Sequence, residues 1–343
     1  MSTAGAVVVY GATGHTGRFV VAELRRRGLA TVASGRNAAQ LEALAAEWAD
    51  VAVRPATVDD PGSLDRALAG AAAVINCAGP FALTGGPVAE AALRAGIPYV
   101  DVAAELEANV SMFTDHAEAA RKAEVPVVPA MAFYGGLGDL LVTAAMGEWT
   151  AADEVHVAYG LSSWHPTAGT RAAGQVSHER RGGRRVRFAD GALQYHDDDV
   201  WEQNWDFPEP LGRRAVIAEF TMADVVTVPS HVEVREVRTY MAVEAARDLA
   251  EESTPEPRSV DALGRSDQTF VVDVLVRAGG TERRATAHGQ DIYAVTAPLA
   301  VEAVQRVLAG RTRTTGVASA GAMFDAADFL RALAPHVTVE LPR

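Results

Sequence analysis

The chain has 343 residues, 49% of them hydrophobic, and a formal net charge of -13 at pH 7. This length predicts two packed units, and the negative charge excludes the positive surface that a nucleic-acid-binding protein needs. No run of about 18 hydrophobic residues predicts a membrane span, no basic segment marks a secretory signal, and the single cysteine, Cys77, excludes an internal disulfide. We therefore expect a cytoplasmic protein that binds neither nucleic acid nor membrane.

Residues 6–129 alternate short hydrophobic segments with helical patterns. Six of these segments predict strands: AVVVYG, TVASG, VAVRPA, AAVINCAG, PYVDVAA and VPVVPA. Strands without polar alternation, separated by helices, are typical of a parallel sheet covered on both faces. We predict an α/β fold in which residues 1–130 form a doubly wound Rossmann-type domain.

From about residue 151 the pattern changes to strands with few helices between them. The predicted strands include DEVHVAYGL, RRVRFADGALQY, AVIAEF, DVVTV and REVRTYMAV. Gly279 and Gly280 predict a hairpin, because glycine accepts the positive φ angles of a two-residue turn. We predict a second α+β domain with a mostly antiparallel sheet over residues 131–290, in which residues 246–267 form a mobile loop. Residues 291–343 predict helices that return to the first domain.

Three glycines separate the first predicted strand from the first predicted helix in VVVYGATGHTGR. Gly11 ends the strand, Gly14 lets the backbone approach a ligand, and Gly17 lets the helix pack on the sheet. The free amides and the dipole of the helix N-terminus favour a pyrophosphate. A tight turn without a ligand is the alternative interpretation. The predicted dinucleotide contacts in this turn are Gly11, Thr13, Gly14, His15, Thr16 and Gly17.

The end of the second predicted strand decides which dinucleotide to expect. An NAD enzyme would place Asp or Glu there for the ribose hydroxyls, whereas ASGRN has no carboxylate before Glu42. Arg36 supplies a planar guanidinium suited to a 2′-phosphate, and Ser34, Gly35 and Asn37 flank it. A surface arginine without function is the alternative. We predict NADP(H) as the cofactor.

Two further strand ends complete the predicted crevice. Asp59 follows the third strand, where it could contact adenine or cap a helix. NCAGPF ends the fourth strand in a turn where the nicotinamide ribose would lie, and its predicted contacts are Cys77, Ala78, Gly79, Pro80 and Phe81. Cys77 is explained more simply as a small buried side chain that packs in the core than as a nucleophile. No HExxH, CxxC or paired-histidine spacing predicts a metal site.

Several segments together resemble one family. INCAGPFALTGGPVAEAALRAGIPYVDVAAE resembles the segment of saccharopine dehydrogenase-like oxidoreductases in which a GP turn leads to a YxDxxGE strand end. VVPAMAFYGGLGDLLVTAA, PTAGTRAAG and HGQDIYAVTAPLAVEAVQRVLAG are similar to blocks of the trans-acting enoyl reductases near this family. The resemblance implies a Rossmann domain, an inserted sheet domain with substrate contacts, and NADP(H). The chain departs from the pattern at Ala104, where the family has glycine, and at Tyr134, where it has aspartate.

The chain has one lysine, Lys122, and no tyrosine precedes it by four residues. The Tyr-x-x-x-Lys mechanism of short-chain dehydrogenases is therefore excluded, and the proton donor must come from other residues. Tyr134 is our first candidate because its strand should deliver it to the carboxyl edge of the sheet. Asp101 is the second candidate, with Glu105 beside it, and His165 of the second domain is the third. Ordinary packing, capping and surface positions are the alternative interpretations of these side chains.

We predict an NADPH-dependent oxidoreductase that delivers hydride to a C=O, C=N or C=C bond of a small metabolite. The alternative is a redox sensor or scaffold that binds NADP(H) without turnover. An enzyme needs an enclosed pocket that faces the nicotinamide, and the size of the inserted sheet domain favours the enzyme over the sensor. A homodimer is the assembly that we consider for it.

Overall fold

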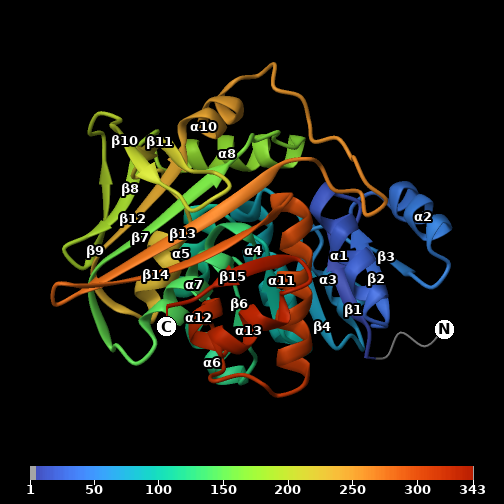
Figure 1. Cartoon of the computed structure of the whole chain (residues 1–343). Coiled ribbons are helices and arrows are strands. Elements are labelled where there is room, and N and C mark those ends of the chain that lie inside the picture. The colour runs from blue at the N-terminus through green and yellow to red at the C-terminus, as the bar shows by residue number, and fades with distance from the viewer. Residues whose placement is uncertain (1–4, 343) are drawn as a thin grey trace.

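The computed structural model of the protein describes residues 5–342 (Figure 1). Residues 1–4, at the start of the predicted first domain, and residue 343, at the end of the predicted tail, lie outside the described part. Within it, two β-sheets stand side by side with helices between and around them (Figure 1). No helix between residues 5 and 342 is long and hydrophobic enough to cross a membrane.

The first sheet is parallel throughout and confirms the predicted Rossmann-type arrangement. In the described chain its six strands follow the order β3-β2-β1-β4-β5-β6. Their bounds are β1 Val7–Tyr10, β2 Thr31–Gly35, β3 Ala52–Pro55, β4 Ala73–Asn76, β5 Tyr99–Asp101 and β6 Val127–Val128. The strand order reverses between β1 and β4, and in open α/β sheets a ligand crevice forms beyond the carboxyl ends of the strands at such a point.

Helices cover both faces of this sheet because the strands are hydrophobic on both sides. Val7 and Val9 of β1 face one hydrophobic core, whereas Val8 and Tyr10 face the other. The first core contains buried residues of α1 His15–Arg26, α2 Ala38–Glu47 and α11 Ile292–Leu308, and the second contains those of α3 Pro61–Leu68 and α4 Phe81–Ala95. Helices α5 Leu106–Asp115 and α6 Ala117–Ala123 follow β5.

The second sheet is mixed and mostly antiparallel, as predicted. Among the described residues its main path is β10-β11-β12-β7-β13-β14-β15, and β8 and β9 extend from β12. Its strands are β7 Ala151–Leu161, β8 Arg185–Ala189, β9 Ala192–His196, β10 Glu202–Asp206, β11 Arg213–Ala218, β12 Glu233–Ala242, β13 Thr269–Ala278, β14 Thr281–Gln290 and β15 Val337–Glu340. Gly279 and Gly280 form the predicted β13–β14 turn, with φ angles of 54° and 79°. Only β7 and β12 pair in parallel within the described sheet.

Several short helical segments accompany the strands of this sheet along the chain. They are the π-helical turn η1 Phe133–Leu137, α7 Gly138–Met146, α8 Ala168–Arg180, α9 Asp224–Thr227, the 3-10 turn η2 Val228–Ser230 and α10 Val243–Ala250. The prediction of a strand at DVVTV is wrong, because these residues form α9 and enter η2. A short hydrophobic run has the same composition in a buried helix as in a strand. Here the buried carboxylate of Asp224 accepts a hydrogen bond from the Tyr159 hydroxyl, and this holds the turn against β7.

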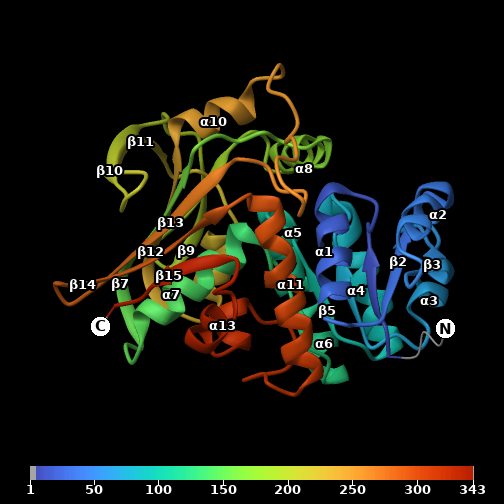
Figure 2. The same ribbon diagram turned by 45° about the vertical axis from the view of Figure 1, so that its right-hand side comes forward.

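The C-terminal tail contacts both domains of the molecule. Helix α11 lies alongside α1 of the first domain (Figure 2). The chain then passes through α12 Ala320–Met323 and α13 Ala326–Ala332, and β15 pairs with β14 of the second sheet. The tail therefore returns to the first domain through α11, but its last strand extends the other sheet. Residues 246–250, predicted as part of a loop, belong to α10.

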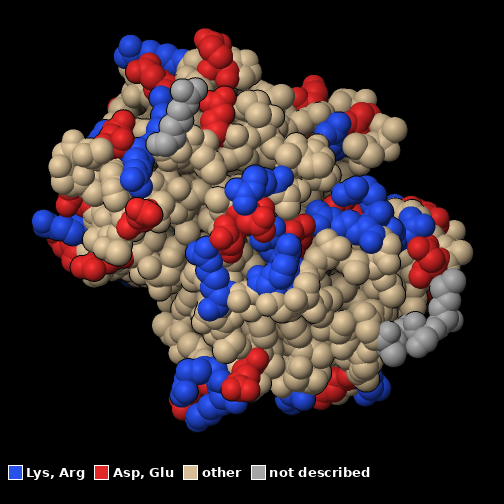
Figure 3. Space-filling model, turned by 60° about the horizontal axis from the view of Figure 1, so that its bottom comes forward, with Lys and Arg blue, Asp and Glu red and all other residues tan. Residues whose placement is uncertain are grey.

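A buried ionic network joins α1 to α11. The Glu302 carboxylate accepts hydrogen bonds from Arg27 at 2.6 Å and from Arg306 at 2.8 Å, and Arg27 also donates to Glu23 at 2.7 Å. The Arg306 side chain is only 3% exposed. Acidic and basic side chains also lie intermixed on the molecular face shown in Figure 3. Because charges are costly to bury unpaired, this network requires α1 and α11 to stay in register.

Glu302→Gln should destabilise the protein by about 3 kcal/mol, because it removes the negative charge that pairs with the largely buried Arg27 and the buried Arg306. The free energy of unfolding from urea titration measures this loss. Glu118→Gln is the matched control, since Glu118 pairs with Lys122 at an exposed position, and exposed pairs contribute at most about 1 kcal/mol. Equal small losses for both variants would show that the network is not stabilising.

Candidate functional site

A cleft of 1260 Å³ runs along the carboxyl ends of β1, β2 and β4 and continues between the two domains. One wall comes from the strand ends of the first sheet. The opposite wall comes from α8, the segment after β11 and the start of α11. The cleft therefore lies where the strand order predicts a ligand site, and the second domain encloses it.

The glycine turn between β1 and α1 forms the floor of the cleft. Gly11 has a φ of 83°, and a Cβ atom there would lie 2.7 Å from the Ala78 nitrogen. A Cβ at Gly17 would lie 2.1 Å from the Gly11 oxygen, so only glycine lets α1 approach the turn this closely. A Cβ at Gly14 would lie 3.3 Å from the Gly11 oxygen, so the turn is tight there as well. Gly11, Thr13, Gly14, His15 and Thr16 line the cleft, and Gly17 lies beneath it.

The end of β2 places the predicted cofactor-discriminating residues in two different environments. Arg36 is exposed at the cleft, and no described residue forms a hydrogen bond or ion pair with its guanidinium. Gly35 and Asn37 also line the cleft, although the Asn37 side chain caps α2 by accepting from the Gln40 amide. Ser34 is fully buried in β2 and does not line the cleft. A guanidinium without a partner is suited to bind a phosphate.

The turns after β3 and β4 bring further predicted residues to the same cleft. Asp59 lies exposed at its edge, beside Thr57. Cys77, Ala78, Gly79 and Phe81 line it, whereas Pro80 precedes α4 as its N-cap residue. Burial raises the pKa of the Cys77 thiol, so the thiol stays protonated and is a poor nucleophile.

Glu105 lies in the cleft at the start of α5. Its Oε1 atom accepts a hydrogen bond from the Phe81 amide at 2.8 Å, and its side chain is buried. Burial raises the pKa of Glu105 to about 7, despite that hydrogen bond. A carboxyl group with this pKa can exchange a proton near neutral pH.

Tyr134 lines the cleft inside a group of aromatic rings. Its ring lies 4.7 Å from Phe133, 4.9 Å from Tyr159 and 5.1 Å from Trp164, measured between centroids. Its hydroxyl is buried and has no hydrogen-bond partner among the described residues. Burial raises the pKa of Tyr134 well above its usual range, so the phenol holds its proton tightly.

The other two predicted proton donors lie apart from the cleft. Asp101 is buried behind it and accepts hydrogen bonds from the Tyr99 hydroxyl and from the amides of Ala103 and Ala130. This carboxylate ties the end of β5 to the end of β6, and burial raises its pKa to about 6. His165 is half-buried between β7 and α8, and its side chain is not among the cleft-lining groups. We therefore carry neither residue into the proposed mechanism.

Tyr293, for which the sequence predicted no role, lies at the centre of a group of hydrogen bonds. Its hydroxyl lies 2.9 Å from the Thr170 hydroxyl and 3.3 Å from both Trp164 Nε1 and the Thr167 amide. The Tyr293 ring also meets the His15 ring edge-on at 5.1 Å. The start of α11 therefore joins the glycine turn to α8. The blocks that contain Thr170 and Tyr293 are visible in the sequence, but their contact is not.

Residues 251–268, largely the predicted mobile loop, border the cleft. Glu252 and Glu256 line it, and Glu256 accepts a hydrogen bond from the Ala168 amide at the start of α8. Arg171 of α8 donates to the carbonyl oxygens of residues 251 and 254. This segment has no regular structure, but it connects α10 across α8 to α1, where Gly264 meets Phe19.

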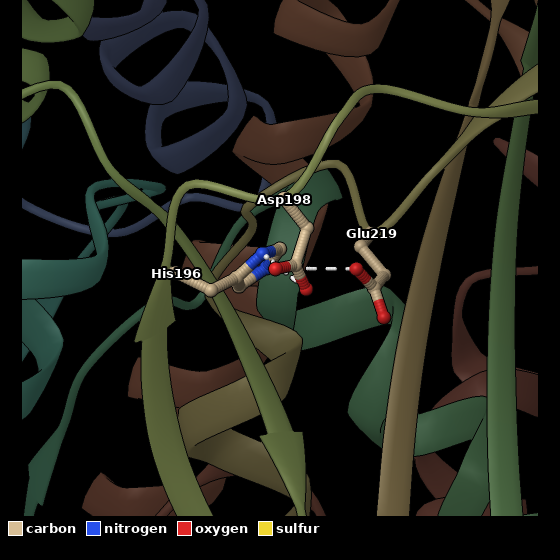
Figure 4. A group of neighbouring side chains, drawn as sticks. All are labelled: His196, Asp198 and Glu219. Atoms are coloured by element: carbon tan, nitrogen blue, oxygen red, sulfur yellow. Dashed lines mark ion pairs between the residues drawn. The ribbon is translucent and has the colours of Figure 1, made fainter.

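A second polar cluster lies away from the cleft in the other sheet, at His196, Asp198 and Glu219 (Figure 4). One ligand atom from each lies within 4.8 Å of the others, which is the spacing of a metal site. However, the Arg187 guanidinium lies 3.0 Å from Asp198 and 3.3 Å from Glu219. This arginine already neutralises the carboxylates and would repel a cation. We assign no metal to this cluster.

Comparison with known proteins agrees with the geometry of the first domain. Residues 7–128 match the family model of the saccharopine dehydrogenase NADP binding domain. A probable mitochondrial saccharopine dehydrogenase-like oxidoreductase of Arabidopsis thaliana is 32% identical over 144 residues, which are 37% of this chain and 31% of that protein. The saccharopine dehydrogenase-like oxidoreductase of Rattus norvegicus is 28% identical over 145 residues, which are 37% of this chain and 34% of that protein. The matched region thus spans about a third of these relatives.

One solved structure matches the whole chain in fold. It is the apo form of saccharopine dehydrogenase (L-Glu forming) from Saccharomyces cerevisiae, with a TM-score of 0.65 over 99% of this chain and 100% of that chain. The sequence identity is 12%, so the match shows a shared fold. Both parts of this fold, including the second sheet, are therefore common to the two proteins.

Arg36→Ala should remove the preference for NADPH over NADH, because Arg36 is the free guanidinium at the predicted 2′-phosphate position. In the unmodified protein we expect NADPH to bind at least about tenfold more tightly than NADH, which corresponds to about 1.4 kcal/mol. Isothermal calorimetry measures both affinities. Arg18→Ala is the control, since Arg18 of α1 pairs with Glu47 outside the cleft. Equal affinities in the unmodified protein would contradict the assignment.

Tyr134→Phe should raise the free energy of unfolding by about 1 kcal/mol in the cofactor-free protein, because it removes a buried donor that has no partner. Tyr159→Phe is the matched control and should lower the stability, since the Tyr159 hydroxyl donates to Asp224 at 2.9 Å. Urea titration of both variants tests the difference. A loss of stability in Tyr134→Phe would show that its hydroxyl is bonded in the folded protein.

Proposed function

We propose that this chain, whose residues 7–128 are an NADP-binding domain of the saccharopine dehydrogenase type, is an NADPH-dependent oxidoreductase that acts on a small metabolite. The nicotinamide would lie at the turn after β4, beside Gly79 and Phe81. The bound cofactor supplies the hydride, and the protein orients it and excludes water.

The observation that carries this proposal is the continuity of the cleft. Beyond the turn at Gly79 it extends into a chamber lined by the second domain, with Trp164, Phe220 and Met222 as hydrophobic walls. Ser177 and Thr221 add polar groups there. Substrate sites are mostly hydrophobic with a few placed polar groups, and this chamber has that composition.

The substrate would have a polar C=O, C=N or C=C bond held against the nicotinamide. The chamber supplies a carboxyl group, Glu105, and the aromatic ring of Tyr134 at that position. Lysine chemistry plays no part, because Lys122 lies on α6, exposed and paired with Glu118. The chamber therefore supports proton transfer by an acid and hydride transfer from the cofactor.

A redox sensor that binds NADP(H) without turnover is the competing function. A sensor needs a surface that responds to the cofactor, but it does not need an enclosed chamber beyond the nicotinamide. The second domain contributes Trp164, Phe220 and Met222 to the walls of the cleft. This arrangement favours the enzyme.

The test is NADPH oxidation by the full chain across a panel of small aldehydes, ketones, imines and enoyl thioesters. Ala173 of α8 faces the turn after β4, since its Cβ lies 3.9 Å from the position of a Cβ at Gly79. Ala173→Trp should fill the entry to the chamber and abolish turnover of any substrate found. Ala172→Trp is the control, because Ala172 is exposed and does not line the cleft.

Two results would contradict the proposal. One is tight NADPH binding with no oxidation across the whole panel, which would favour the sensor. The other is equal turnover in Ala173→Trp and the unmodified protein, which would place the reaction outside the chamber.

A further inference from the structure

Glu105 occupies the N-cap position of α5, but its side chain makes no capping hydrogen bond with that helix. N-cap side chains usually accept a hydrogen bond from the first turn of their own helix. The Glu105 carboxylate instead reaches α4 and accepts a hydrogen bond from the Phe81 amide through Oε1. The side chain is therefore held in the cleft, next to the turn where the nicotinamide would lie.

The two oxygens of this carboxylate differ. Oε1 is held by Phe81, whereas no hydrogen bond from a described side chain or amide of another residue reaches Oε2. Asp101, four residues earlier, has donors on both oxygens and is closed off from the cleft. Glu105 thus has one oxygen fixed for orientation and one left for a ligand.

The charged neighbours of Glu105 favour its protonated form. Burial is the largest cause of its raised pKa of about 7, and the carboxylates of Asp101 and Glu107 add to it. On the facing helix α8, Arg181 and His178 line the cleft. Arg181 lies 4.0 Å from Glu107 and donates to Ser177, which in turn donates to Glu107. The arginine is therefore engaged with Glu107.

Tyr134 is a weaker proton donor in this geometry. Its hydroxyl is sealed from solvent, and burial raises its pKa well above the usual range for tyrosine. Such a phenol resists losing its proton near neutral pH, and a general acid is most effective when its pKa lies near the working pH. The cleft therefore offers a better acid in Glu105 than in the residue that the sequence favoured.

We propose that Glu105 is the general acid of the reductase reaction, an inference that rests on the proposed function. The carbon of the substrate's polar double bond accepts hydride from the nicotinamide, with its two electrons. The other atom of that bond takes the proton from the Glu105 carboxyl group. The substrate is reduced, the cofactor leaves as NADP⁺, and water returns a proton to the Glu105 carboxylate.

A carboxyl group at this position should also affect the affinities of the protein for NADP⁺ and NADPH in the absence of substrate. The nicotinamide ring carries a positive charge in NADP⁺ and none in NADPH. An ionised Glu105 beside the ring stabilises NADP⁺ relative to NADPH, and a protonated Glu105 does not. The ratio of the two dissociation constants should therefore change with pH as Glu105 titrates. The 2′-phosphate is present in both forms, so its own titration cancels in the ratio.

The experiment measures the dissociation constants of NADP⁺ and NADPH for the full chain by calorimetry between pH 6 and pH 8. For the unmodified protein, the ratio of the NADP⁺ constant to the NADPH constant should fall by at least about threefold as pH rises, which is the effect of one nearby charge screened by water. Glu105→Gln should hold the ratio constant. Glu105→Asp should keep a pH-dependent ratio, because it retains the carboxyl group.

Glu107→Gln is the matched control, since Glu107 does not line the cleft and bonds to Ser177. It should keep the pH dependence of the unmodified protein, with a slightly lower midpoint because one neighbouring negative charge is gone. A ratio that does not change with pH in the unmodified protein overturns the role of Glu105. A pH dependence that persists in Glu105→Gln belongs to another group and also overturns it. If neither cofactor form binds, the proposed function fails instead.

Discussion

The packing of α11 against α1 is the constraint on which the rest of the structure depends. Helix α11 starts directly after β14 of the second sheet, and its buried Glu302 binds Arg27 of α1. At the other end of the same helix pair, Tyr293 meets His15 at the glycine turn. Burying these charges is favourable only when the two helices are aligned. That alignment sets the position of the second domain relative to the NADP-binding turn and therefore the shape of the cleft.

The cleft combines a proposed cofactor half with a proposed substrate half. The cofactor half consists of backbone turns at strand ends, where glycines allow close approach and helix α1 offers free amides. The substrate half consists of side chains from α8, from the segment after β11 and from α11. Sequence similarity to curated relatives covers 37% of this chain, whereas the fold of the yeast structure covers 99% at 12% identity. The fold is therefore shared at low sequence identity.

Asp101 and Glu105 illustrate how neighbouring acids acquire different roles. Asp101 is the last residue of β5 and Glu105 lies four residues further on, and burial raises the pKa of each. Asp101 meets three donors and joins two strand ends, so its carboxylate is structural. Glu105 accepts from one amide of another element and lines the cleft, so we propose that its proton is available to a ligand. The difference depends on which residues of other elements donate hydrogen bonds to each carboxylate. The sequence around the two acids does not show these contacts.

The sequence by itself determined the Rossmann-type fold of the first domain and its cofactor, and it predicted the strand ends that line the cleft. Hydrophobic strands without polar alternation require cover on both faces, and the three-glycine turn lies between the first strand and the first helix. Local pattern was therefore sufficient to predict the fold and the cofactor. The mixed sheet was also predicted, but DVVTV was assigned to a strand, because a short buried run has no period that separates strand from helix. Only the tertiary structure decided that Ser34 and Asp101 lie outside the cleft and that Tyr293 joins the glycine turn to α8. It also showed that β15 extends the second sheet and that the Glu105 carboxylate lines the cleft, held by the Phe81 amide. Each of these depends on contacts between residues far apart in the chain, which determine burial and hydrogen bonding and leave no local signal in the sequence.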